Sequence, residues 1–181
     1  MFKFLINPSR FNKLADIIFN PLLIITSLTL FVGLVLTYFS PLDYQQGLTV
    51  KIMYIHVPSA WLALLTYAIM TFYSVIGLAF KIPFSFTVIT AIAPIGAVFT
   101  LLCLISGSMW GKPMWGTWWV WDARLTSVAI LFIIYLIIIF LNQTFENREV
   151  REKIIASGLI IISVNLLNLD GFIKNLNIIY F

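Results

Sequence analysis

The sequence predicts an all-α fold: a polytopic membrane helix bundle of about five transmembrane helices, with a tryptophan-rich amphipathic loop on its outer face. Of the 181 residues, 61% are hydrophobic and only 10% are charged, whereas a soluble domain carries about a quarter charged residues. The apolar residues form long runs, and a helix needs ~20 such residues to cross a bilayer. Five of the six tryptophans fall within residues 110–121, between two of these runs. We therefore expect a single integral membrane domain over residues 1–181.

Each apolar run predicts one membrane-spanning helix. The five candidate spans are residues 21–40, 57–80, 84–106, 125–141 and 154–169. Pro94 removes a backbone donor inside the third span, which predicts a kink there. The tryptophan-rich loop, residues 107–124, joins the third span to the fourth. The charged connector at 142–153 is expected either to be solvated or to extend a helix beyond the membrane.

The basic residues predict the orientation, because cytoplasmic loops of membrane proteins carry an excess of Lys and Arg. One side of the predicted bundle carries Lys3, Arg10, Lys13, Lys81, Arg148, Arg151 and Lys153. The other side carries Lys51, Lys112, Arg124 and Lys174. This bias predicts an N-terminus on the cytoplasmic or matrix side, with His56 and the tryptophan-rich loop on the opposite face. The N-terminal stretch has no small-residue cleavage site, so no cleaved signal peptide is expected.

The composition argues against several classes of function. Cys103 is the only cysteine and lies in an apolar run, so we interpret it as a packing residue that forms no internal disulfide. Without a CxxC or CxxCH motif, the chain matches neither a thiol oxidoreductase nor a c-type cytochrome. The net charge of +4 is explained by orientation and does not support nucleic-acid binding. No catalytic residue is predicted, and the chain is not expected to be an enzyme.

The only histidine, His56, lies in the stretch YIHVPSAW, where the first outer loop is expected to enter the second helix. Pro58 is compatible with the first turn of that helix, where its missing N–H costs little. Imidazole is a common ligand of heme iron. The alternative is an amphipathic histidine at the membrane interface that binds nothing, which is the commoner situation for a lone histidine.

The stretch WGKPMWGTWWVW holds more indole rings than an interfacial aromatic belt requires, since a belt usually takes one or two rings per helix end. If residues 115–122 are helical, Trp115, Trp118, Trp119 and Asp122 share one face at i, i+3, i+4 and i+7. That face would form a flat aromatic platform for a planar apolar ligand, with Trp121 pointing elsewhere. Gly111 and Gly116 would leave room for a close approach.

The residues beside these tryptophans extend the interpretation. Asp122 lies where the fourth helix is expected to begin, so capping that helix is its simplest role. Arg124 could snorkel to the membrane surface or bind a carboxylate with its guanidinium. A porphyrin combines a planar apolar body, two carboxylates and an iron. Tryptophan, arginine and histidine side chains match these three features.

The stretch WGKPMWGTWWVWDARLTS resembles the tryptophan-rich signature of the heme-handling membrane proteins of cytochrome c maturation. Together with YIHVPSAW, it most resembles the heme exporter protein C (CcmC) family, over residues 21–165. The resemblance implies transient binding of heme b at the outer membrane face and its delivery to the heme chaperone CcmE. It also implies association with the ABC-type partners CcmA and CcmB. The membrane would be the mitochondrial or bacterial inner membrane, and the isoleucine-rich composition favours the mitochondrial one.

The resemblance also implies the site residues. His56 would be an axial ligand of the heme iron, and the other heme-contacting residues would be Trp110, Trp115, Trp118, Trp119, Trp121, Asp122 and Arg124. The family usually has six spans and a second histidine after the fifth. This chain departs from that pattern, because its sequence predicts five spans and contains one histidine. Either the C-terminal part of the chain is divergent or truncated, or another ligand completes the iron coordination. Met109, Met114 or the imidazole of a partner chain would be that ligand.

Two other functions remain open from the sequence. A non-catalytic structural subunit of a membrane complex would use the aromatic residues only to anchor the loop. A small-molecule transporter would have its pathway among the helices. Ionisable residues inside the membrane normally mark such pathways, and the predicted spans contain almost none.

Overall fold

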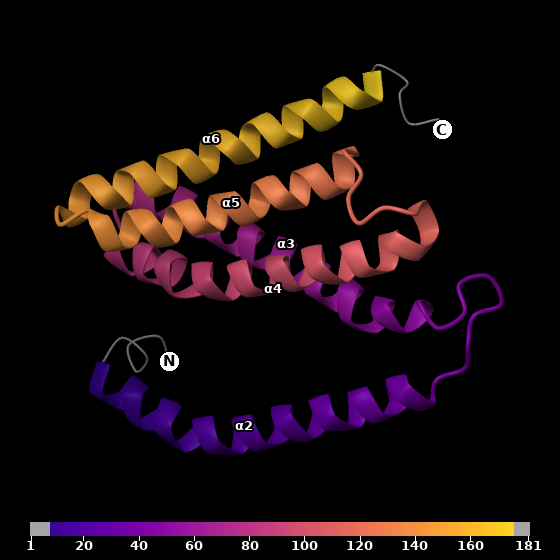
Figure 1. Ribbon diagram of the computed structural model, residues 1–181. Helices are drawn as coiled ribbons and strands as arrows, with labels where there is room; N and C mark the ends of the chain where they lie inside the picture. Colours follow the sequence, from indigo (N-terminus) through magenta and orange to yellow (C-terminus); the bar gives the residue numbers. More distant parts are fainter. Residues whose placement is uncertain (1–7, 176–181) are drawn as a thin grey trace. The chain divides into compact units, whose positions relative to one another are not determined.

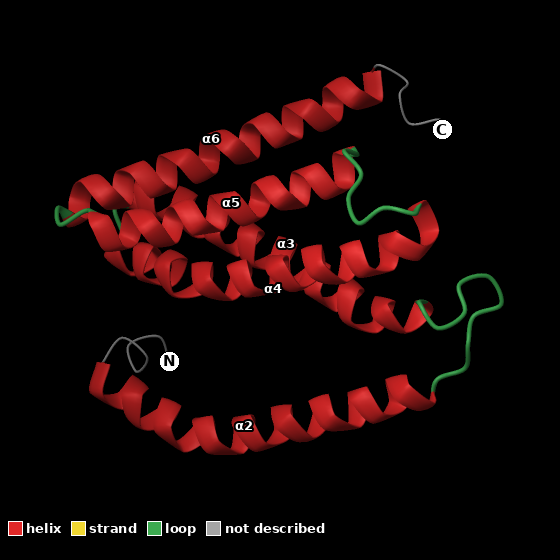
Figure 2. Ribbon diagram, viewed as in Figure 1, coloured by secondary structure: helices red, strands yellow, loops and turns green. Residues whose placement is uncertain are grey.

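A computed structural model describes the backbone of residues 8–175 and the side chains of residues 12–82 and 84–163. Every regular element in this part of the chain is a helix, as Figures 1 and 2 show. The helices are α2 (Pro8–Phe39), α3 (Val50–Phe80), α4 (Pro83–Trp115), α5 (Ala123–Thr144) and α6 (Arg148–Asn175). The predicted all-α, polytopic membrane fold is confirmed.

The described helices fall into two compact units, residues 1–51 and 52–181. The first contains α2, whose apolar span has no buried side chain and is therefore suited to lipid contact. Its helix begins at Pro8, well before the expected start at residue 21, and Pro21 lies inside it. A tight turn follows, in which the Asp43 carboxylate accepts hydrogen bonds from the backbone N–H groups of Gln45 and Gln46.

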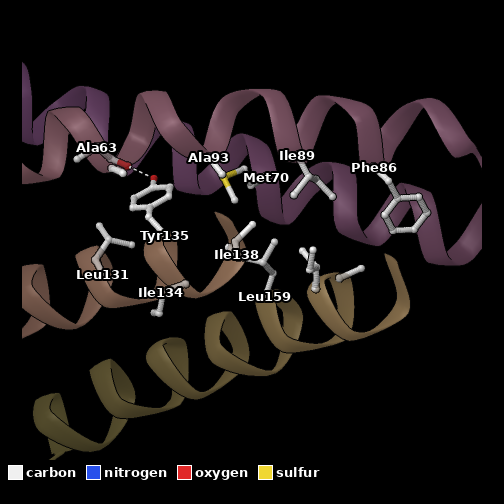
Figure 3. Close-up of a cluster of buried hydrophobic side chains, with 13 residues drawn as sticks. Ala63, Met70, Phe86, Ile89, Ala93, Leu131, Ile134, Tyr135, Ile138 and Leu159 are labelled. Atoms are coloured by element: carbon white, nitrogen blue, oxygen red, sulfur yellow. Dashed lines mark hydrogen bonds between the residues drawn. The ribbon is translucent and has the colours of Figure 1, made fainter. Parts of the chain in front are cut away.

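The second unit contains α3 to α6, and its core lies where these helices meet. Apolar side chains from all four helices form this core: Ala63, Met70, Phe86, Ile89, Ala93, Ala97, Leu131, Ile134, Tyr135, Ile138, Ile155, Ala156 and Leu159. Tyr135 of α5 is fully buried and points at α3 in Figure 3. Its hydroxyl donates to the Ala63 carbonyl at 2.7 Å and lies 2.7 Å from Thr66 Oγ1. Buried polar groups are thus satisfied across the helix interface.

Two helices extend further than the sequence predicted, and both extensions affect the candidate site. Helix α3 starts at Val50 instead of residue 57, so His56 lies in its second turn and Pro58 lies inside it. One proline removes a single helical hydrogen bond, and the helix continues through it. Helix α4 continues to Trp115, so the expected loop start at residue 107 is wrong. The glycine and serine residues after Ile105 do not end the helix, because each lowers helix propensity by only about 1 kcal/mol or less and tertiary packing can outweigh that cost.

Four of the described helices, α2 to α5, are long and apolar enough to cross a membrane. The fifth predicted span, residues 154–169, lies within α6, and the helix already begins in the charged connector at Arg148. Salt bridges between residues four apart, Arg148–Glu152 and Lys153–Glu149, stabilise that first part. Side chains beyond residue 163 lie outside the described residues, so the fifth span stays a prediction.

Candidate functional site

The second unit has a cleft of about 180 Å³. Its lining residues come from the beginning of α3, the end of α4 and the beginning of α5, which lie at one end of this unit (Figure 1). It is lined by His56, Ala60, Cys103, Leu104, Gly107, Trp110, Trp115, Arg124, Leu125 and Val128. The fold therefore brings four of the predicted site residues together, although they come from three helices. The walls are mainly apolar, and the imidazole and the guanidinium are the ionisable groups that could bind a polar ligand there.

The His56 imidazole is held by α4 through its Nδ1 atom. This atom lies 3.1 Å from the Cys103 carbonyl oxygen and 3.0 Å from Ser106 Oγ. A carbonyl can only accept a hydrogen bond, so the contact requires the proton of the neutral ring on Nδ1. The lone pair then lies on Nε2, for which no partner exists among the described side chains. A histidine that ligates a metal commonly has this arrangement, with one nitrogen donating to a carbonyl and the other free.

Trp110 and Trp115 form the aromatic wall of the cleft. Their ring centroids are 5.7 Å apart and their planes meet at 84°. The Trp115 ring folds back over Gly111, where a Cβ atom would lie 2.7 Å from the ring carbon Cζ3. The absence of a side chain at Gly111 is therefore what allows Trp115 to lie against its own helix.

The predicted aromatic helix over residues 115–122 is wrong. Gly116 adopts a left-handed backbone conformation with φ of 73°, and its N–H donates to the Lys112 carbonyl, which ends α4. The chain is then non-helical until Asp122 begins α5. Because the i, i+3, i+4 pattern requires a continuous helix, no flat platform forms from these rings.

The three remaining tryptophans of the motif do not line the cleft. Trp118 is exposed and lies beneath the Lys112 ammonium group, which is 5.7 Å from its ring centroid. Trp119 and Trp121 pair edge to face at 5.6 Å. The Trp119 indole N–H is buried and has no hydrogen-bond partner among the described residues. Trp121 is 83% exposed, which suits a ring at a membrane interface.

Asp122 has the capping role that its position predicts. Its Oδ1 accepts a hydrogen bond from the Leu125 N–H at 2.7 Å, which satisfies one of the free donors at the start of α5. Its Oδ2 lies 3.2 Å from the Arg124 guanidinium. Arg124 is largely exposed and uses one nitrogen in this contact, so most of its donors remain available to an anion.

Replacement of Asp122 by alanine is expected to lower the free energy of unfolding by about 1 kcal/mol, because α5 loses its N-cap. Thermal unfolding of the purified protein in detergent measures this change. Asp122→Asn is the matched control, since an amide oxygen still caps the helix while the contact with Arg124 weakens. A larger loss in Asp122→Asn than in Asp122→Ala would contradict the capping role.

Sequence reasoning missed Ser106 and interpreted Cys103 only as packing. The signal was present, because Cys103, Ser106, Gly107 and Trp110 recur at i, i+3, i+4 and i+7 along α4. This spacing places them on one helix face, and that face is the one that meets His56. The pattern was hidden because the helix was expected to end at residue 106.

Comparison with known proteins gives a consistent result. A family model described as heme exporter protein C (CcmC) matches residues 1–181. The heme exporter protein C of Bradyrhizobium diazoefficiens is 43% identical over 162 residues, which are 90% of this chain and 62% of that protein. That of Haemophilus influenzae is 47% identical over 125 residues, 69% of this chain and 50% of that protein.

A putative cytochrome c biosynthesis CcmC-like mitochondrial protein of Marchantia polymorpha is 56% identical over 97 residues, 54% of this chain and 42% of that protein. The chain thus spans about half to three fifths of the length of the bacterial relatives that it matches. Helices suited to membrane crossing and a match over the whole chain lead to the same conclusion: this is an integral membrane protein that belongs to the heme exporter protein C family.

Proposed function

We propose that this chain binds heme at the cleft end of its helix bundle and delivers it to a heme chaperone during cytochrome c biogenesis. One observation carries the proposal: His56, whose Nδ1 is held by α4, lines the same cleft as two indole rings and a guanidinium. The imidazole would ligate the iron, Trp110 and Trp115 would contact the macrocycle, and Arg124 would bind a propionate.

The volume of the cleft agrees with a heme that is only partly enclosed and is then transferred to another protein. Pockets that enclose a ligand usually measure about 300–1,000 Å³, whereas this one has about 180 Å³. A macrocycle would insert one edge and leave the rest exposed. An exposed edge favours transfer, because a partner protein can contact the heme before it leaves. CcmE would be that partner, CcmA and CcmB would form the associated complex, and the chain itself would catalyse no reaction.

Charge placement supports an orientation with the cleft on the periplasmic or intermembrane side. Lys81, Arg148, Arg151 and Lys153 line two clefts formed by the α3–α4 turn and the start of α6. These basic residues lie at the opposite end of the unit from His56. The positive-inside rule assigns that end to the cytoplasm or matrix.

The second axial ligand would come from outside the described cleft. Met109 and Met114 are each about half exposed, and neither lines the cleft with His56. The hypothesis that methionine ligates the iron gains no support from this placement. A histidine of a partner chain is the ligand that agrees best with an exposed iron face.

Titration of the detergent-purified full chain with hemin tests the proposal. We expect a saturable Soret band shifted from that of free hemin, with about one heme per chain. A chain that takes up no hemin beyond an empty detergent control would favour the structural-subunit function instead. Reconstitution with purified CcmE then tests delivery, because the pigment should move to the chaperone.

Replacement of Trp115 by alanine is expected to weaken hemin binding by several-fold to about tenfold. An aromatic contact contributes about 0.5–1.5 kcal/mol beyond area burial, and 1.4 kcal/mol corresponds to a factor of ten. Trp61→Ala is the matched control, because Trp61 is 71% exposed and outside the cleft. Equal losses in both variants would show that the tryptophan effect is not specific to the cleft.

A further inference from the structure

We infer that Ser106 is the positioning residue of the heme site: with the Cys103 carbonyl, it keeps the proton of the neutral His56 ring on Nδ1, so that Nε2 faces the cleft as an iron ligand. The contacts of Ser106 and His56 support the positioning itself. Its consequence for iron binding rests on the proposed function.

The hydroxyl of Ser106 acts as an acceptor toward the imidazole. Ser106 Oγ lies 2.6 Å from the Leu102 carbonyl oxygen, and it is also 3.2 Å from that of Cys103. A hydroxyl has one hydrogen, and both carbonyls can only accept, so this hydrogen points into the helix. The lone pairs of Oγ are then directed at His56 Nδ1, at 3.0 Å. The Nδ1–H group thus meets two oxygen acceptors. In the tautomer with the proton on Nε2, the only donor left for Nδ1 among the described contacts would be the weak Cys103 thiol, 3.9 Å away.

Gly107 leaves the room in which the ring lies close to α4. A Cβ atom at this residue would lie 3.1 Å from His56 Cε1, which is closer than such atoms normally approach. The imidazole therefore rests against the backbone of α4 while Ser106 and Cys103 hold Nδ1. A ring fixed in plane and tautomer loses little freedom when it binds a metal, which is the general advantage of a preorganised ligand.

Hydrogen bonding at Nδ1 also changes the ligand strength of Nε2. Groups that accept a hydrogen bond from the ring nitrogen that does not bind the metal raise the basicity of a metal-binding histidine. Removal of such a group typically weakens metal binding by 10–100-fold. A more basic ligand stabilises ferric iron relative to ferrous iron, and hydrogen bonds to an axial ligand are one of the means by which a protein sets heme potential. Ser106 would therefore favour retention of oxidised heme.

The single histidine of the chain makes the tautomer directly measurable. Nitrogen NMR of the heme-free full chain, with ¹⁵N only in histidine, gives signals from one imidazole. We expect the neutral wild-type ring to carry its proton on Nδ1. In Ser106→Ala the fraction with the proton on Nε2 should increase, although the Cys103 carbonyl remains. Ser106→Thr keeps the hydroxyl and should retain the wild-type signals.

Ser74→Ala is the matched control, because Ser74 is a buried serine that likewise donates to a carbonyl four residues earlier, at 2.8 Å, and lies far along α3 from His56. It should leave the imidazole signals unchanged. A wild-type ring protonated on Nε2 would overturn the inference without any variant, and so would identical signals in wild type and Ser106→Ala.

Heme binding provides the second measurement and separates the two proposals. Ser106→Ala should bind hemin about tenfold more weakly, and its heme potential should shift to more positive values, while Ser106→Thr and Ser74→Ala match wild type. If the wild type carries its proton on Nδ1 yet binds no hemin, the proposed function fails and the positioning role of Ser106 stands. If hemin binds normally in Ser106→Ala at an unchanged potential, the positioning role fails and the proposed function stands.

Discussion

Replacement of His56 by alanine is expected to abolish saturable hemin binding to the purified chain. Loss of a partner behind a metal-binding histidine typically costs 10–100-fold in metal affinity, and loss of the ligand itself should cost more. The chain has no second histidine to substitute for it. Soret absorbance during hemin titration measures the loss, and circular dichroism checks that the helices remain.

A chemical rescue distinguishes ligation from a structural effect. In His56→Gly, added imidazole can enter the space left by the side chain and restore an axial nitrogen. Recovery of the Soret band with imidazole, and not with a similarly sized molecule that lacks a ligating nitrogen, is the expected result. Unchanged hemin affinity in His56→Ala would mean that the iron does not bind at this position.

Replacement of Gly96 by alanine is expected to destabilise the second unit by about 3 kcal/mol or more, the upper part of the range for overpacking a core. A methyl group at this position would overlap ring carbons of Tyr135 and lie 2.7 Å from its hydroxyl oxygen. The ring cannot move aside, because it is fully buried and its hydroxyl donates to the Ala63 carbonyl. Thermal unfolding in detergent, or the yield of monodisperse protein, measures the change.

Gly158→Ala is the matched control for this helix substitution. Apart from the neighbouring residues and backbone of its own helix, nothing lies within 4 Å of the position that a Cβ atom would take at Gly158. Alanine is favoured over glycine inside a helix by roughly 0.5–1 kcal/mol. It should therefore be neutral or stabilising. Combining Gly96→Ala with Tyr135→Leu should cost less than the sum of the two single changes, because the clash exists only when both the methyl group and the ring are present. Full additivity would contradict direct contact.

The elements were largely predictable from the sequence, and their ends were not. A run of ~20 apolar residues fixes a membrane helix because every backbone polar group in the bilayer must be satisfied within the segment. The ends of the helices depend on the backbone conformation of individual residues near the membrane surface. The left-handed Gly116 ends α4 nine residues beyond the expected position, and Pro58 is tolerated inside α3. Neither outcome follows from hydropathy.

The candidate site was likewise only partly predictable from the sequence. The sequence by itself determined a polytopic helical membrane protein and its family, and it supplied the candidate site residues, His56, the tryptophans and Arg124 among them. Only the tertiary structure decided which of them meet. Trp110 and Trp115 share a cleft with His56, whereas Trp118, Trp119 and Trp121 are directed elsewhere once Gly116 ends the helix.

The tertiary structure also decided what holds His56 Nδ1, because its partners, Ser106 and the Cys103 carbonyl, lie about fifty residues away on another helix. The physical reason is general. Hydropathy and local conformation act over a few residues and are present in the sequence itself, whereas a hydrogen bond between two helices exists only after packing has fixed their rotation and depth relative to one another.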